Sequence, residues 1–265
     1  MNGTRVILAA HRGDKFKHPE NTMPAFRAAV ELGVDMIETD VRMTADGELV
    51  LMHDRSALRT AGVDQNIDEL TLAQVRELDV GAPFSEEFKG VRIPTVQEFL
   101  EYIVPTGVLV NWELKIYPRD FGDETAFAVA DRLIDMIDRY GMGERSMVNS
   151  FSARVLEHIC KNHGHRFPIH GQGIYHCRKS GDTAEMPEHE LFDWCCLYPN
   201  EKGLTALDCK ENFDHCLAHG VIPCLCIADR ADAYRKALDY GCKMCTSNNI
   251  YEGARILSEL GARPM

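Results

Sequence analysis

The sequence predicts an α/β fold in which parallel strands alternate with helices and close into one barrel. Strand-like apolar runs alternate with amphipathic stretches along the chain, a pattern typical of βα units in a parallel sheet. The chain has 265 residues, and one α/β barrel commonly uses about 250 residues. No internal repeat or linker divides the sequence. We therefore expect a single TIM (β/α)8 barrel domain over residues 1–265.

Nine segments have the composition of a strand, one more than an eight-stranded barrel needs. They are Val6–Ala10, Met36–Val41, Leu49–His53, Val108–Leu114, Ser146–Asn149, Pro168–Gln172, Trp194–Leu197, Val221–Ile227 and Lys243–Thr246. The connector between Val41 and Leu49 is too short for the crossover of a dozen residues that joins parallel neighbours. It contains Asp46-Gly47, a dipeptide favoured in two-residue hairpin turns. We therefore expect a long hairpin over Met36–His53, whose second arm is antiparallel and lies outside the count of eight.

The hairpin also predicts a contact between polar side chains. If Asp46-Gly47 forms the two-residue turn, counting outward places Asp40 opposite His53. Directly opposed residues have Cβ atoms about 4.5–5.5 Å apart. Glu38 lies two residues before Asp40 and therefore shares its face of the strand. The hairpin is expected to gather two carboxylates and a histidine.

Capping signals mark the first helix. Asn21 or Thr22 can cap its start, Pro24 fits its first turn, and Gly33 can end it. Further helices are expected at Thr71–Leu78, Thr95–Ile103, Glu124–Tyr140, Ser152–Asn162, Thr205–His219, Arg230–Tyr240 and Ile250–Leu260.

Two long connections are expected to be irregular. The Asp54–Pro94 connection is rich in Gly, Pro and acidic residues, and a connection of this length is usually a lid or a small excursion. We expect it to form a lid-like insertion over the active-site face, at the carboxyl ends of the barrel strands. Ile174–Glu190 is expected to form a second irregular loop.

Composition and charge limit the class of partner. The formal net charge is −12, which argues against nucleic acid and anionic membrane surfaces, because surplus lysine and arginine bind both. No apolar run reaches the ~18–20 residues of a membrane span. Met1–Arg5 shows no signal-peptide pattern, so a cytoplasmic location is expected. An anionic small molecule would need a local positive site against this acidic background.

The ten cysteines are expected to be free thiols, since disulfides belong to oxidising compartments. Cys242 and Cys245 form a CxxC motif, and Cys224 and Cys226 could complete a zinc site. Most of these cysteines lie in strand-like apolar runs, so packing in the core is the preferred interpretation.

Carboxylates near the ends of predicted strands indicate a metal site. Glu38, Asp40 and Glu113 would converge on one face of the barrel. Two negative charges about 4 Å apart repel by about 4 kcal/mol at the effective dielectric of a protein site. A divalent cation would compensate for this repulsion, and oxygen ligands that leave room for water and phosphate suit Mg²⁺, with Ca²⁺ as the alternative.

Histidines and cations complete the candidate site. Two histidines at strand ends, His11 and His53, fit a general acid and a general base, because imidazole titrates near neutral pH. His53 has a second interpretation as a metal ligand, since it is expected opposite Asp40. Arg12 and Lys115 would supply the local positive charge for a phosphate.

The motifs around these residues resemble those of the glycerophosphodiester phosphodiesterase family in type and order. They are His11-Arg12-Gly13, Pro19-Glu20-Asn21-Thr22, Glu38-Thr39-Asp40, His53-Asp54 and Glu113-Leu114-Lys115, extended by Ile93-Pro94-Thr95 and Ser150-Phe151. The resemblance implies a TIM barrel that hydrolyses glycerophosphodiesters to sn-glycerol 3-phosphate and an alcohol with a divalent metal. It also implies an acid/base pair (His11 and His53), metal ligands (Glu38, Asp40 and Glu113) and phosphate contacts (Arg12 and Lys115).

The resemblance weakens toward the C-terminus. Leu225–Ala228 stands where the family usually has Trp-Thr-Val-Asn, and Cys245–Asn249 where it usually ends in an Ile-Thr-Asp-Asn-Pro-like run. Those family positions line the pocket for the glycerol or the leaving alcohol. Trp112 could replace the missing aromatic surface or pack in the barrel wall. Two alternatives therefore stay open: a phosphodiesterase for a specialised sugar or lysophospholipid diester, and a phosphate-binding barrel without turnover, which would need no acid/base pair.

Overall fold

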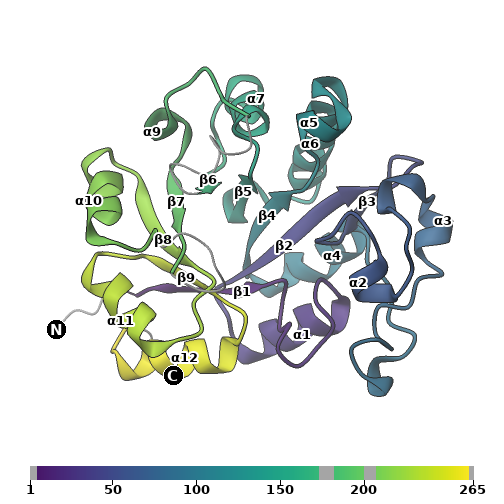
Figure 1. The fold of residues 1–265 in the computed structure, drawn as a ribbon, viewed down its shortest axis with the longest axis horizontal. Helices are drawn as coiled ribbons and strands as arrows, with labels where there is room; N and C mark the ends of the chain where they lie inside the picture. The colour runs from purple at the N-terminus through teal and green to yellow at the C-terminus, as the bar shows by residue number, and fades with distance from the viewer. Residues whose placement is uncertain (1–4, 173–181, 200–206, 263–265) are drawn as a thin grey trace.

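The computed structural model describes residues 5–172, 182–199 and 207–262. Within these residues, nine strands form one sheet in the order β1-β9-β8-β7-β6-β5-β4-β2-β3, and β1 also pairs with β2. The strands are β1 (Ile7–His11), β2 (Met36–Met43), β3 (Leu49–Leu51), β4 (Leu109–Leu114), β5 (Ser146–Ser150), β6 (Ile169–Gln172), β7 (Trp194–Leu197), β8 (Ile222–Cys226) and β9 (Met244–Ser247). Neighbouring strands run parallel except β2 and β3. The strands other than β3 therefore close into the predicted TIM (β/α)8 barrel (Figure 1).

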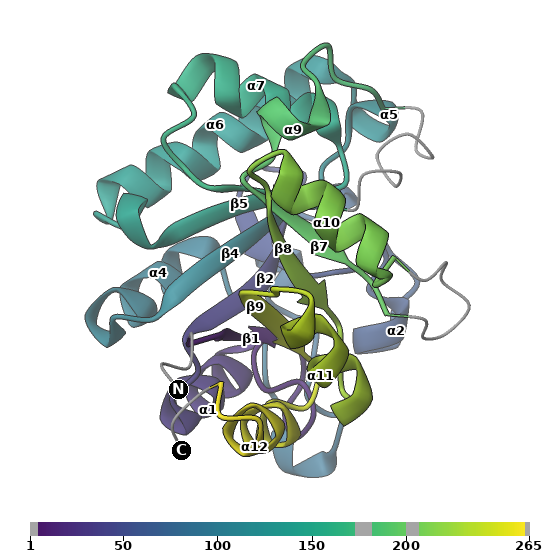
Figure 2. The ribbon, with the colours of Figure 1, turned by 90° about the vertical axis from the view of Figure 1, so that its left-hand side faces the viewer.

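Helices cover the outside of the barrel. The α-helices are α1 (Met23–Leu32), α2 (Leu58–Ala61), α3 (Leu72–Val75), α4 (Val96–Ile103), α5 (Pro118–Phe121), α6 (Asp123–Arg139), α7 (Ala153–His163), α9 (Glu188–Leu191), α10 (Lys210–Ala218), α11 (Ala231–Asp239) and α12 (Ile250–Glu259). Short 3₁₀ helices occur at Ile67–Glu69, Glu86–Phe88, Val104–Thr106 and Gly143–Arg145. Figure 2 shows α6 and α7 on one side of the sheet and α1 and α12 on the opposite side. Among the helices that the structure describes, none combines the length and apolar character needed to cross a bilayer.

Capping explains where several helices begin. The side chains of Thr71, Thr95 and Ser152 each accept a hydrogen bond from the backbone N–H three residues later. α10 begins at Lys210, later than predicted, and residues 205–206 of that prediction lie outside the described residues. Residues 174–181 of the second predicted loop also lie outside them.

Trp112 packs in the barrel wall. Its side chain is fully buried, and its Nε1–H donates to Ser146 Oγ at 3.0 Å. Its ring meets that of Phe99, on α4, edge-on with centroids 5.5 Å apart. The residue therefore joins strand to helix and adds no aromatic surface to a ligand pocket.

The predicted two-residue turn of the hairpin is wrong. Thr44 N–H donates to Glu48 O at 2.9 Å, and Gly47 N–H donates to Thr44 O at 2.9 Å. The loop therefore has three residues, 45–47, and Gly47 takes the left-handed conformation with φ 83°. A type I turn followed by a left-handed residue is the usual form of a three-residue hairpin loop.

The extra loop residue shifts the register by one. Val41 pairs with Leu51, and Met52 N–H donates to Asp40 O, so Asp40 lies opposite Met52 and not opposite His53. A shift of one residue reverses the face on which each side chain of a strand lies. His53 follows the end of β3, where the chain leaves the ladder, and it reaches the barrel mouth from there.

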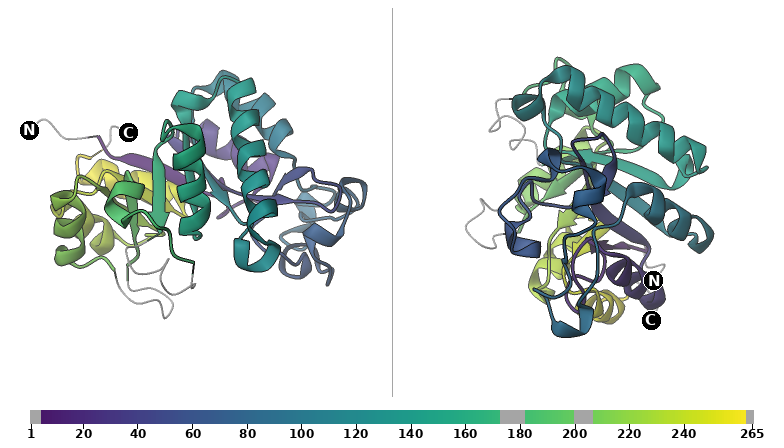
Figure 3. Two further views of the ribbon diagram at one scale, coloured as in Figure 1. Left: turned by 90° about the horizontal axis from the view of Figure 1, so that it is seen from above. Right: turned by 90° about the vertical axis from the view of Figure 1, so that its right-hand side faces the viewer.

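The connection over residues 54–94 has an apolar core of its own. This apolar cluster comprises Ala57, Ile67, Leu70, Val75, Leu78, Val80 and Ile93 of the connection, together with Val50 and Met52 of the hairpin. The segment, dark blue in the left-hand view of Figure 3, projects to one side of the barrel. Its packing makes it a small folded layer on the hairpin. That this layer acts as a lid over the active-site face stays a prediction.

Candidate active site

The ends of two neighbouring strands bring the three predicted carboxylates together. Glu38 and Asp40 lie on β2, and Asp40 pairs in register with Glu113 on β4. One oxygen of each carboxylate lies within 4.8 Å of the corresponding oxygens of the others. All three residues are buried, with at most 6% of their surface exposed. This arrangement could hold a divalent cation.

Two cations face these three carboxylates. Arg12 Nε lies 3.1 Å from Asp40 Oδ2, and Lys115 Nζ lies 3.2 Å from Asp40 Oδ1. Lys115 also contacts Glu113 Oε1. Glu38 Oε1 is buried and has no hydrogen-bond partner among the described residues. A buried carboxylate oxygen without a partner is unusual in proteins, and a bound cation would supply the missing partner.

Burial disfavours the state in which all three carboxylates are ionised. Burial, with Asp40 and Glu113 nearby, raises the pKa of Glu38 well above its ordinary value. Burial and Asp40 also raise the pKa of Glu113, against the opposing charge of Lys115. The pKa of Asp40 is lowered, because Lys115 and Arg12 outweigh its burial. The cluster therefore needs further positive charge before all three carboxylates are ionised.

A strained backbone segment holds Arg12 beside Asp40. Arg12 and Asn21 both have positive φ angles, 60° and 54°, a region rare for residues other than glycine and most often tolerated by asparagine. Asn21 N–H donates to Arg12 O at 3.0 Å, and its side-chain Nδ2 donates to Asp40 Oδ2 at 2.8 Å. Asn21 therefore orients the carboxylate and does not cap α1. Gly13 is required here, because a Cβ would lie 2.8 Å from the carbonyl carbon of Ala25.

His11, at the end of β1, presents one ring nitrogen to the carboxylates. Its Nδ1 lies 2.6 Å from Asn248 Oδ1, and its Nε2 lies 3.8 Å from Glu38 Oε2. An Nδ1–H that donates to Asn248 leaves the Nε2 lone pair facing the cluster. Burial, then the charges of Arg12 and Lys15, hold the pKa of His11 well below its ordinary value. This environment therefore favours the neutral form of the ring.

The carboxylate of Asp54 orients the ring of His53, as the amide oxygen of Asn248 orients that of His11. His53 Nδ1 lies 2.6 Å from Asp54 Oδ1, and Arg42 Nη2 donates to the His53 carbonyl oxygen at 2.7 Å. Burial, then the charge of Lys115, lowers the pKa of His53 to about 4, although Asp54 opposes this change. The Asp54 contact fixes the Nδ1–H tautomer and leaves Nε2 available, a geometry suited to proton transfer.

One cavity of about 470 Å³ joins these groups. Its lining residues are His11, Arg12, Glu38, His53, Asn111, Glu113, Lys115, Asn149, Phe151, His170, Tyr198, Cys226, Ile227 and Thr246. Four of these residues carry no sequence pattern that marks them as site residues: Asn111, Asn149, His170 and Tyr198. Asn111 pairs with Glu38 and Asn149 with Glu113 in adjacent strands. That register was the missing signal, because the sequence shows which residues lie on a strand but not how parallel strands align.

The cysteines depart from the expectation of free thiols at one pair. Cys196 and Cys226, on neighbouring strands with Cα atoms 5.6 Å apart, form a disulfide. Cys242 and Cys245, of the CxxC motif, are buried and free, with sulfurs 3.9 Å apart. Cys242 Sγ donates to Met244 O at 2.9 Å. The CxxC therefore packs in the core as expected, and the disulfide arises because adjacent barrel strands place two sulfurs within reach.

The sequence matches the model of the Glycerophosphoryl diester phosphodiesterase family over residues 11–173, more than half of the chain. The chain belongs to this family. Members of the family with curated descriptions align over a similar length. The glycerophosphodiester phosphodiesterase of Caldanaerobacter subterraneus subsp. tengcongensis is 38% identical over 161 residues, which cover 59% of this chain and 63% of that protein. Glycerophosphodiester phosphodiesterase 1 of Rattus norvegicus is 32% identical over 154 residues, 57% of this chain and 44% of that protein.

The chain thus spans less than two thirds of these relatives, but the fold similarity extends over nearly all of it. A glycerophosphoryl diester phosphodiesterase structure from Silicibacter pomeroyi has a TM-score of 0.83 at 22% identity and covers 99% of this chain and 96% of that one. A phosphodiesterase of Oleispira antarctica, solved with the product sn-glycerol-3-phosphate, has a TM-score of 0.79 at 20% identity and covers 96% of each chain. The family fold therefore continues past residue 173, where the match to the family model ends.

Proposed function

We propose that this chain hydrolyses glycerophosphodiesters to sn-glycerol 3-phosphate and an alcohol. Membership of the family supports this reaction, as do the curated relatives named for it. The observation that carries the proposal is one cavity lined by two oriented histidines, two cations and two members of the three-carboxylate cluster. A site that only bound a phosphodiester would have no use for two imidazoles whose Nδ1 atoms are both held by acceptors.

Glu38, Asp40 and Glu113 would hold a divalent cation. Their buried oxygens are hard ligands, which favours Mg²⁺, with Ca²⁺ as the alternative. When bound, such a cation polarises a phosphoryl oxygen and offsets negative charge that develops during the reaction. The unpartnered Glu38 Oε1 and the raised pKa of Glu38 support this assignment.

Arg12 and Lys115 would bind the phosphodiester. Both are held by Asp40, and both line the cavity. Arginine offers a planar fork of N–H donors that matches phosphate oxygens, and lysine offers a compact charge. These two cations can attract an anionic group into the cavity of an acidic protein.

His11 and His53 would exchange protons with the substrate through Nε2. One imidazole takes a proton from the attacking hydroxyl, which belongs to water or to the glycerol moiety itself. The other gives a proton to the leaving alkoxide. Each transfer typically contributes about 10²–10⁴-fold to the rate. The contacts to Asn248 and Asp54 hold both rings in the tautomer that this exchange requires.

A substrate panel tests the proposal. Glycerophosphocholine, glycerophosphoethanolamine and lysophosphatidylcholine are each incubated with the enzyme in Mg²⁺, in Ca²⁺ and in chelator, and phosphomonoester release is measured. We expect metal-dependent release of sn-glycerol 3-phosphate from the first two substrates. Turnover of lysophosphatidylcholine alone would favour the lysophospholipid alternative, and tight binding without any release would indicate a non-catalytic barrel.

A further inference from the structure

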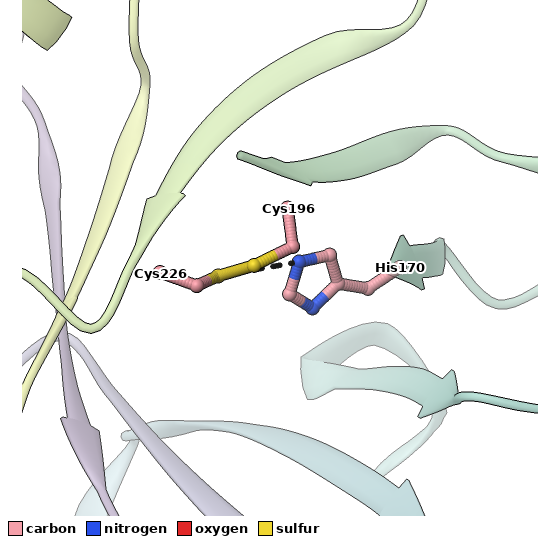
Figure 4. Close-up of side chains that lie close together, drawn as sticks. All are labelled: His170, Cys196 and Cys226. Carbon is pink, nitrogen blue, oxygen red and sulfur yellow. Dashed lines mark hydrogen bonds between the residues drawn. A yellow bond between two sulfur atoms is a disulfide. The ribbon is translucent and has the colours of Figure 1, made fainter. Parts of the chain in front are cut away.

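A second cluster of metal-ligating side chains lies inside the barrel, on β6, β7 and β8. His170 Nε2 and the sulfurs of Cys196 and Cys226 lie within 4.8 Å of one another, and all three residues are buried (Figure 4). The mechanism above uses none of them. Both cysteines lie beyond residue 173, where the family match ends. His170 lies near the end of the matched range.

We propose that His170, Cys196 and Cys226 bind Zn²⁺ when the Cys196–Cys226 disulfide is reduced. Reduction by a thiol or a phosphine adds two electrons and two protons to the S–S bond and yields two thiols. Zinc binding then releases these two protons, and two Zn–S bonds and one Zn–N bond form. The disulfide and the zinc site are alternative states of the same sulfurs.

The geometry of the cluster suits zinc. Zn–S bonds of about 2.3 Å and Zn–N bonds of about 2.0–2.1 Å place the ligand atoms of a tetrahedral site roughly 3.5–3.8 Å apart. His170 Nε2 lies 3.8 Å from Cys226 Sγ. The Cα atoms of Cys196 and Cys226 are 5.6 Å apart, so rotation about the Cα–Cβ bonds can separate the two sulfurs without movement of the strands.

The charge of this ligand set also favours zinc. Two thiolates and one neutral imidazole around Zn²⁺ give a net charge of zero, which a buried site tolerates far better than an unpaired ion. Sulfur ligands select zinc over magnesium, whereas the carboxylate site offers oxygen alone. The two sites would therefore take different metals.

The side chain of Asn111 gives a second, independent indication that His170 can bind a metal. Its Nδ2 lies 2.9 Å from His170 Nδ1, and its Oδ1 is buried without a hydrogen-bond partner among the described residues. A half-turn of the amide would let His170 Nδ1–H donate to Oδ1 and would leave the Nε2 lone pair facing the sulfurs. Metal-binding histidines commonly donate their second N–H in this way. Without metal, Nε2 is paired with Cys224 Sγ, 3.1 Å away, which is the contact that zinc would displace.

Cobalt tests the proposal because Co²⁺ replaces Zn²⁺ and absorbs strongly when thiolates bind it. The full chain, purified under a phosphine reductant and held in excess Mg²⁺ to fill the carboxylate site, is titrated with Co²⁺ without oxygen. We expect thiolate-to-cobalt absorption that saturates at one equivalent per chain and disappears when Zn²⁺ is added. The variant Cys226→Ser should lose this absorption, and His170→Gln should weaken Co²⁺ binding at least tenfold.

Two controls keep the test decisive. Cys209→Ser removes a thiol outside the cluster and should leave the absorption unchanged. The oxidised wild-type chain, whose sulfurs are bonded to each other, should show no absorption, and this comparison does not depend on the folding of any variant. A reduced wild-type chain that gives no thiolate absorption would overturn the proposal, as would absorption that persists in Cys226→Ser or after oxidation.

Discussion

Arg59 and Glu20 form a two-pronged ion pair that ties the segment 54–94 to the barrel mouth. Arg59 Nη2 and Nη1 lie 2.6 and 3.0 Å from the two oxygens of Glu20. Arg59 Nε also donates to Asp54 Oδ2 at 2.5 Å, and Glu20 Oε1 accepts from Arg12 Nη1 at 2.9 Å. A continuous chain of charged contacts thus joins α2 to the residue proposed to bind phosphate.

Replacing Arg59 with methionine should raise the KM for the substrate. The pair is half exposed on the arginine side, so its loss should cost about 1 kcal/mol, which equals a roughly fivefold rise in KM if Arg12 loses its support. Steady-state kinetics with glycerophosphocholine measures this. Arg55→Met is the matched control, because it removes the similar fork to Asp68 in the same segment. Equal KM values in the two variants would show that the fork to Glu20 has no role in binding.

Alanine at His11 or at His53 should abolish most turnover while the fold survives. Loss of an acid or base step predicts a fall in kcat of about 10²–10⁴-fold. Single-turnover assays and thermal unfolding measure the two effects separately. His163→Ala, on the outer surface of the barrel beside Asp131, is the control and should keep wild-type kcat. Near-normal turnover in both His11→Ala and His53→Ala would remove the acid/base assignment.

Glu113→Gln should raise the metal concentration that half-maximal activity requires. The amide keeps the shape of the side chain but removes one of three charges that would hold the cation. Loss of a residue that only supports a metal ligand typically reduces affinity by about 10–100-fold, so loss of a ligand charge should cost at least as much. Activity is measured against Mg²⁺ concentration. Glu101→Gln, exposed on α4, is the control. An unchanged metal requirement in Glu113→Gln would exclude Glu113 as a ligand.

The strands and the carboxylate cluster could be predicted because both depend on local patterns. Apolar runs fix where β2 and β4 lie, and the parallel sheet then places Glu38, Asp40 and Glu113 at one end. The contribution of Asn111 could not be predicted, because it depends on how β4 aligns with β2. The Cys196–Cys226 disulfide depends on the spacing of β7 and β8 in the same way.

The register error at the hairpin has a different cause. Asp46-Gly47 is compatible with a two-residue and with a three-residue loop, and both give Gly47 a positive φ. Asp46 Oδ1 accepts hydrogen bonds from Thr44 Oγ1 at 2.6 Å and from Leu72 N–H at 2.9 Å. The contact with Leu72, 26 residues away, helps to select the longer loop, and no local pattern could reveal it.

Gly47→Ala should therefore destabilise the chain, because Gly47 has φ 83°. A non-glycine residue in the left-handed region costs about 1–2 kcal/mol. Gly47→Asn is the matched variant and should lose less, since asparagine tolerates this conformation. Urea unfolding of the three proteins gives the free energies. If alanine and asparagine are equally tolerated, the left-handed conformation of residue 47 does not limit stability.

The stabilising effect of Glu20 should depend on pH. Burial alone would raise the pKa of Glu20, but the hydrogen bond from Arg59 and the charges of Arg12 and Lys15 lower it to about 2. A carboxyl group whose pKa is lower in the folded state stabilises the fold at pH values above its unfolded-state pKa of about 4.3. This contribution is lost as the pH falls toward the folded-state pKa.

At pH 7 the free energy of unfolding of the Glu20→Gln variant should therefore be roughly 2–3 kcal/mol lower than that of the wild type. The difference should shrink between about pH 4.3 and pH 2, because protonated Glu20 and glutamine are then equivalent in charge. Urea unfolding of both proteins across that range measures it, and a difference that stayed constant with pH would mean that the three cations do not lower the pKa of Glu20.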